Sequence, residues 1–77
     1  MRTIKVAWLD AFSGVGWMGL EEAESQKPSV IDTTGYEITN NELRVTIARD
    51  IGNGLVGAPI TIPAQAIISV EVICEDN

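Results

Sequence analysis

The sequence predicts a small all-β domain, and three observations lead to this prediction. Apolar and polar residues alternate from Thr3 to Trp8 and again from Glu42 to Ile47, which is the period-two pattern of half-buried strands. Residues that favour turns separate the apolar stretches, most clearly at Gly52-Asn53-Gly54. The stretch from Ile60 to Ile73 fits two strands that are interrupted at Pro63, because proline has no N–H to donate to a β-ladder.

The first strand is followed by a long connection that runs from Asp10 to Pro28. It contains Trp17, Met18 and Leu20 and then an acidic run, with a short helical turn predicted over residues 20–25. Connections of this length in compact domains are usually functional or mobile. Because of its apolar residues, we expect this connection to fold back onto the domain.

The middle of the chain predicts two further strands and a loop. The second strand covers Val30 to Ile38 and contains Gly35, which marks a bulge or a sharp bend. Asn40-Asn41 predicts a tight turn before the third strand, since Asn tolerates a positive φ. A glycine-rich loop then runs from Asp50 to Pro59, with Asn53-Gly54 as its tip.

The end of the chain suggests how the strands are arranged. Residues Pro63 to Ala66 suit a single 3₁₀ turn, with proline fixing its opening φ. A strand, a 3₁₀ turn and a last strand form the corner of small SH3-like barrels. We therefore predict one domain over residues 1–77, a five-stranded SH3-like barrel with a 3₁₀ turn before its last strand.

The last strand predicts an oligomer. Its apolar residues lie on both faces: Ile68, Val70 and Val72 on one, and Ile67 and Ile73 on the other together with Ser69 and Glu71. An apolar edge strand invites pairing with another chain. A core this small supplies only about 3–5 kcal/mol of stability, and a single cysteine, Cys74, forms no intrachain disulfide. We expect a homo-oligomer with its interface at Ile67, Ser69, Glu71 and Ile73.

Composition disfavours several classes of partner and location. The formal charge is −6, from eleven acidic and five basic residues, whereas affinity for nucleic acids comes mainly from Lys and Arg on phosphates. The apolar stretches are too short for a transmembrane helix, and the N-terminus lacks the apolar region of a signal peptide. We expect a cytoplasmic protein without a membrane partner, in agreement with an unpaired Cys74.

Catalysis is not expected. The chain has no histidine, the most frequent general acid or base, and nothing beside Cys74 to activate its thiol. Clustered soft ligands for zinc are also missing. We therefore predict no enzyme activity, no catalytic residue, no cofactor and no metal site.

Four residues are candidates for binding: Trp8, Trp17, Met18 and Arg44. Aromatic side chains stack on ligands and anchor interfaces, but for Trp8 we favour a position in the core over a role in binding. Trp17 is either a lid over the barrel mouth, the interpretation we favour slightly, or an anchor for a partner. Arg44 either holds an anionic ligand or lies on a solvated strand face.

Several motifs resemble those of small uncharacterised proteins from phages and prophages. The matching positions are Trp8 with Asp10, Gly16-Trp17, Thr33-Thr34-Gly35-Tyr36 and Ile62-Pro63-Ala64-Gln65-Ala66-Ile67, which together span nearly the whole chain. A group of such phage proteins is similar to Sm-like barrels, which assemble side by side into rings. Ala66-Ile67 followed by Val70 also resembles the second half of an Sm motif.

The resemblance implies a ring-forming Sm-like barrel, in the host cytoplasm if the protein is phage-encoded. Sm and Hfq proteins usually begin with an N-terminal helix, which is absent here, and their RNA-contacting positions have no clear match in this acidic chain. Three hypotheses follow: a non-enzymatic assembly that binds a protein or small-molecule partner, an RNA-binding ring, and a protein that sequesters a host factor or a nucleotide signal. We favour the first.

Overall fold

The computed structural model describes residues 1–11 and 16–75, and most of them lie in β-strands. The described elements follow one another as β1 (Arg2–Asp10), α1 (Leu20–Glu24), β2 (Ser29–Asn40), β3 (Arg44–Ala48), β4 (Asp50–Gly52), β5 (Leu55–Gly57), β6 (Ile60–Pro63), a 3₁₀ turn (Ala64–Ala66) and β7 (Ile67–Glu75). The all-β class is thereby confirmed, and α1 is the short helical turn expected in the first connection.

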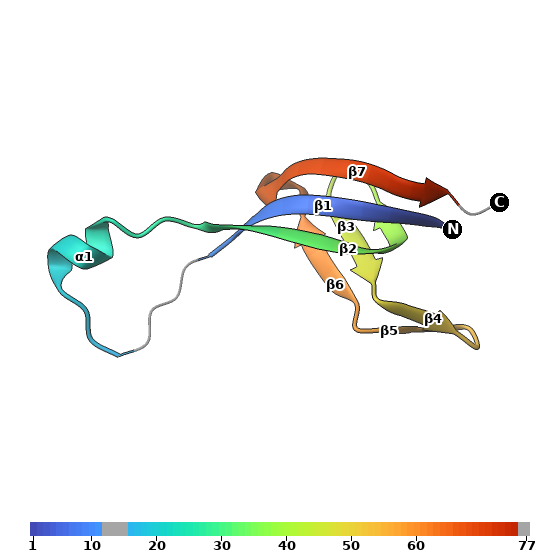
Figure 1. The fold of residues 1–77 in the computed structure, drawn as a ribbon, viewed down its shortest axis with the longest axis horizontal. Helices are drawn as coiled ribbons and strands as arrows, with labels where there is room; N and C mark the ends of the chain where they lie inside the picture. The colour runs from blue at the N-terminus through green and yellow to red at the C-terminus, as the bar shows by residue number, and fades with distance from the viewer. Residues whose placement is uncertain (12–15, 76–77) are drawn as a thin grey trace.

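Five strands form one antiparallel sheet in the order β6-β3-β2-β1-β7. Strands β6 and β7 are its two edges (Figure 1). Within the described residues these edges do not pair with each other, so the sheet is not closed by a continuous ladder. We predicted a five-stranded barrel, whereas the described residues form seven strands, five of them in this sheet.

Strands β4 and β5 form a separate hairpin within the stretch that we predicted to be a loop. Its tip is Asn53-Gly54, as expected, with φ angles of 53° and 73°. Two successive positive φ angles are the geometry of a type I′ turn, which matches the twist of the paired strands. The hairpin was missed because strands of three residues are too short to show an alternating pattern.

The predicted 3₁₀ turn is present at Ala64–Ala66 and joins β6 to β7. Pro63 precedes it with φ of −65°, the angle that its ring imposes. The backbone N–H of Ala64 donates to the carbonyl oxygen of Leu43 at 3.0 Å, which ties the turn to the start of β3. The turn carries the chain from one edge of the sheet to the other.

The hydrophobic core is small and is built from three strands of the sheet. Its fully buried side chains come from β1, β3 and β6: Ile4, Val6, Val45, Ile47, Ala48 and Ile62. Four partly buried residues pack around them, namely Trp8, Ile60, Ala66 and Ile67. With so few buried side chains, a single chain has little apolar area with which to offset the entropy of folding.

The described part of the connection between β1 and β2, residues 16–28, does not fold back onto the sheet, contrary to our expectation. We call its residues 16–28 the arm; it projects away from the sheet and makes the molecule 52 Å long but only 23 Å and 20 Å across (Figure 1). The cause is the β1–β2 ladder, which continues to the pair Asp10 and Ser29. The last described pair between β1 and β7 is Trp8 with Ile67. The two strands therefore leave the sheet as a ribbon that directs the arm outwards.

Candidate interaction surfaces

The free edge of β7 is the first candidate surface. The strand pairs with β1 on one side and with no described strand on the other. Val70 and Val72 lie opposite Val6 and Ile4, and residues opposite each other in a ladder share a face of the sheet. Both valines therefore point to the core side, yet they remain 39% and 44% exposed. The apolar surface of the core thus continues to an edge that is uncovered in the monomer.

Two register shifts in the β1–β7 ladder change the faces that simple alternation predicts for β7. Ile67 lies opposite Trp8 and packs against the core, so it shares a face with Val70 and Val72 rather than with Ser69 and Glu71. The reason is that a bulge inserts an unpaired residue and reverses the alternation. The unpaired residues are Ile68 and Ile73, which are 56% and 51% exposed.

The remaining predicted interface residues lie on the other face of β7. Ser69 is opposite Ala7, and Glu71 is opposite Lys5. The Lys5 Nζ and a Glu71 carboxylate oxygen are 4.0 Å apart, with both side chains largely exposed, so this ion pair contributes little stability. The four predicted interface residues are therefore distributed over both faces of the strand and one of its bulges.

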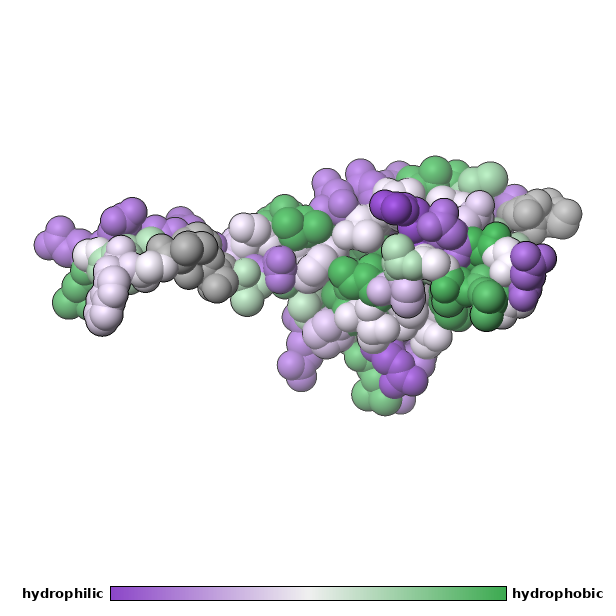
Figure 2. Space-filling view, turned by 90° about the horizontal axis from the view of Figure 1, so that it is seen from below, coloured by the Kyte–Doolittle hydropathy of each residue, from purple (hydrophilic) through white to green (hydrophobic). Residues whose placement is uncertain are grey.

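The exposed surface of the chain is large for its mass. It amounts to 5852 Å², whereas a compact monomer of 8.3 kDa exposes about 4,600 Å². Part of this excess belongs to the arm, and part to exposed aliphatic side chains on the sheet and the β4–β5 hairpin. Figure 2 shows hydrophobic groups spread among hydrophilic ones over the sheet-bearing end of the molecule.

A charged cluster that sequence analysis missed joins β1, β2 and β7. The Arg2 guanidinium donates two hydrogen bonds to the Glu37 carboxylate, from Nε at 3.0 Å and from Nη2 at 2.6 Å. Asn40 Nδ2 donates a third hydrogen bond to the same carboxylate at 3.0 Å. Glu75 Oε1 lies 3.8 Å from Arg2 Nη1. The hydrogen bonds from Arg2 and then from Asn40 hold the pKa of Glu37 below its ordinary value. Only the β1–β2 register reveals that Arg2 and Glu37 face each other.

Trp8 is part of the fold. Its side chain packs against the core, and its indole Nε1–H donates to the Thr33 hydroxyl at 2.9 Å. Arg44 is exposed at the start of β3, opposite Pro63. Trp8 and Arg44 thus lie on different strands, and Trp17 and Met18 lie in the arm; no described hydrogen bond or ion pair joins these candidates into one site.

The arm is the second candidate surface. Trp17 is fully exposed, at 104% of its reference area, and Leu20 is 76% exposed. Trp17 therefore does not act as the lid that we favoured. Glu21, Glu22 and Glu24 are also exposed, and α1 has no buried residue. The arm thus presents apolar side chains and a row of acids together, away from the sheet.

The described residues offer little that could form another kind of site. Over residues 1–11 and 16–75 there is no cluster of metal-binding side chains and no pocket, and no helix there could span a membrane. No protein-family model, curated protein or solved structure matches this chain. The β7 edge and the arm are therefore the two candidate interaction surfaces of the described residues.

Proposed function

We propose that this chain is a non-enzymatic assembly module, an Sm-like (SH3-like) barrel protomer of the phage type that forms a closed homo-oligomer through β7. The observation that carries the proposal is the outer edge of β7, which has no described partner strand and where Val70, Val72, Ile68 and Ile73 are exposed. Unpaired edges with apolar side chains favour the addition of another strand.

Ring closure is supported by the order of the strands. The two edges of the sheet, β6 and β7, are different strands, so pairing β7 of one copy with β6 of the next is a head-to-tail contact. Such contacts form a ring if the rotation between copies closes. A neighbour at this edge would also cover Val70 and Val72 and so extend the small core across the interface.

The partner of this assembly is a protein or a small molecule rather than RNA. Each copy carries a charge of −6, so a ring presents a strongly negative average field, which repels phosphate. The described residues also offer no enclosed pocket within one chain. A small-molecule site would therefore have to lie between subunits.

The test is the mass of the assembly in two matched variants. We expect Ile68→Glu combined with Ile73→Glu to give monomers, because charges on an edge strand oppose pairing. Leu55→Glu, in the β4–β5 hairpin, is the control, since Leu55 is also exposed. Light scattering together with circular dichroism separates loss of assembly from loss of fold. The proposal is wrong if the β7 variant assembles like the wild type.

A further inference from the structure

The arm combines the features of a docking element at one place. Trp17 is fully exposed and Leu20 is 76% exposed, and the two residues lie three positions apart in the sequence. Glu21, Glu22 and Glu24 follow directly, all exposed. Large apolar side chains with a charged rim are typical of the residues that dominate protein interfaces. Contact of the apolar Trp17 and Leu20 side chains with water is unfavourable, so burying them against a partner would lower the free energy.

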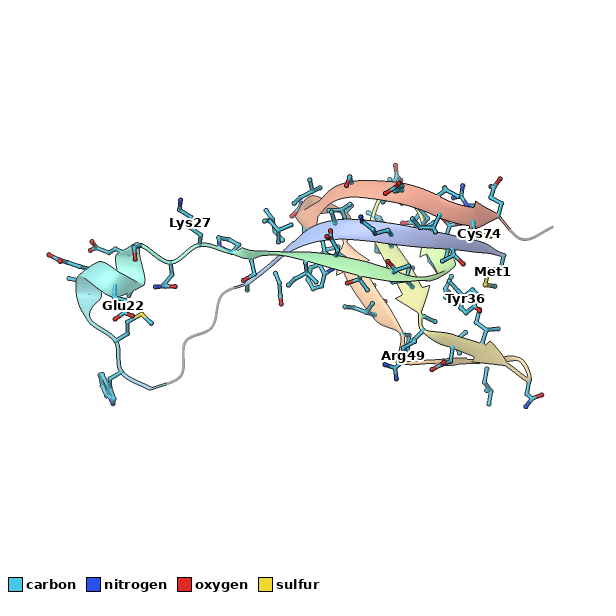
Figure 3. All side chains as sticks on the ribbon, viewed as in Figure 1. Met1, Glu22, Lys27, Tyr36, Arg49 and Cys74 are labelled. Carbon is cyan, nitrogen blue, oxygen red and sulfur yellow. The ribbon has the colours of Figure 1, made fainter. Side chains whose placement is uncertain are left out.

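The local structure of the arm is held by its own hydrogen bonds. The Ala23 N–H donates to the Gly19 carbonyl oxygen at 2.9 Å, and Ser25 N–H to that of Glu21 at 3.2 Å. The side chains of Ser25 and Gln26 both donate to the Glu22 carbonyl oxygen. Figure 3 shows Glu22 and Lys27 on the arm, at the opposite end of the molecule from Arg49, Tyr36 and Cys74. A partner can therefore bind the arm without contacting the far end of the sheet.

The negative charge of the arm restricts the class of partner that can bind it. The arm has three acidic residues and one basic residue, Lys27, while the rest of the chain has eight acidic and four basic residues. A second copy is therefore acidic too and would repel the arm. Nucleic acids and anionic membranes have the same sign of charge. A protein surface rich in Lys and Arg is the class that attracts the arm.

We propose that the arm docks into an apolar pocket rimmed by Lys and Arg on a partner protein, with Trp17 and Leu20 as anchors. This inference rests on the proposed function in one respect, since it names the protein partner of the assembly. Trp17 and Leu20 would fill the pocket, and the three glutamates would pair with the basic rim. Such rim pairs speed association and weaken as salt is added.

The test uses a labelled short amphipathic peptide of Lys and Leu as the probe, with a Glu/Leu peptide of the same pattern as its counterpart. Fluorescence anisotropy should show that the chain binds the Lys/Leu peptide in a salt-dependent way and does not bind the Glu/Leu peptide. Trp17→Ala and Leu20→Ser should each weaken binding by about tenfold, the usual effect of losing an anchor.

Matched charge variants separate the arm from the overall charge of the chain. Glu21→Gln, Glu22→Gln and Glu24→Gln together remove three charges from the arm, and Asp32→Asn, Glu42→Gln and Asp50→Asn remove three from exposed positions elsewhere. Only the arm triple variant should lose about tenfold in affinity. Equal losses in both triple variants would overturn the proposal, as would unchanged binding by Trp17→Ala or no binding of the Lys/Leu peptide at all.

Light scattering on the same samples distinguishes this proposal from the proposed function. The wild type and the Trp17→Ala variant should form assemblies of the same mass, because the copies are proposed to contact each other through β7 and not through the arm. A drop in mass on Trp17→Ala would show that a second copy covers the arm and would overturn the docking proposal. Loss of assembly in the β7 variants, with peptide binding retained, would leave both proposals intact.

Discussion

Gly35 in β2 lies directly against the backbone of Ala48 in β3: a β-carbon added to Gly35 would be 2.7 Å from the Ala48 carbonyl oxygen. Real β-carbons do not approach an oxygen this closely, so any side chain forces the two strands apart. Ala48 itself is buried. We therefore expect Gly35→Ala to reduce the free energy of unfolding by about 1–3 kcal/mol, as overpacking does, measured by urea denaturation.

The control for this prediction is Gly52→Ala in β4. A β-carbon there meets no atom within 4 Å, so the same chemical change should leave the urea midpoint almost unchanged. If Gly35→Ala and Gly52→Ala have the same stability, β2 and β3 are not in close contact at this position.

The Arg2–Glu37 cluster should make stability depend on pH. Because the pKa of Glu37 is lowered in the folded chain from its ordinary value of 4.5, the unfolded state binds the proton more readily. The stabilisation is therefore fully present above pH 4.5 and is lost as the pH falls through the folded pKa of Glu37. Thermal melts should show Glu37→Gln melting below the wild type near neutral pH, with the gap closing in acid.

Glu71→Gln is the control for the pH prediction, since it also removes one carboxylate that pairs with a basic residue. The Lys5–Glu71 pair is exposed and its atoms are 4.0 Å apart, so we expect only a small effect at any pH. A Glu37→Gln variant whose melting curve follows that of the wild type from neutral pH to acid would show that the cluster contributes nothing.

The two tryptophans should respond in opposite ways to truncation. Trp8 packs against the core and donates a hydrogen bond to Thr33, so Trp8→Ala should cost up to about 3 kcal/mol, the low end for buried aromatic residues. Trp17 is fully exposed, and Trp17→Ala should leave the Tm unchanged. A large loss of stability on Trp17→Ala would mean that this side chain covers the sheet after all.

Single-stranded RNA should not bind tightly. With a charge of −6 per chain, we expect affinity no better than the weak non-specific range, about 10⁻⁴–10⁻⁶ M at physiological salt. Filter binding with a mixed-sequence RNA measures this directly. Nanomolar affinity would favour an RNA-binding ring over the assembly that we propose.

The strands and turns with strong local signals could be predicted from the sequence. Alternation marks β1 and β3, Asn53-Gly54 marks the hairpin tip, and Pro63 marks the end of β6. In each case a few neighbouring residues determine the backbone, through side-chain burial, a positive φ or a missing N–H. For these strands and turns, the neighbouring residues alone are sufficient for a correct prediction.

The features that depend on register could not be predicted. The shifts that place Ile67 with Val70 and Val72 arise from pairing with β1, and the bond between Arg2 and Glu37 also needs that pairing to be known. The direction of the arm is set by how far the β1–β2 ladder runs beyond the sheet. Because Trp17 is a large apolar residue, we wrongly expected its side chain to be buried. The amino-acid sequence does not show whether the sheet is close enough to cover it.

The measurement that tests the central claim most directly is the mass of the wild-type protein in solution. Light scattering at micromolar concentration, supported by native mass spectrometry, should give one species at a multiple of the 8.3 kDa chain mass. Its mass should not change in the Leu55→Glu control. A single species of 8.3 kDa at these concentrations would contradict assembly through β7.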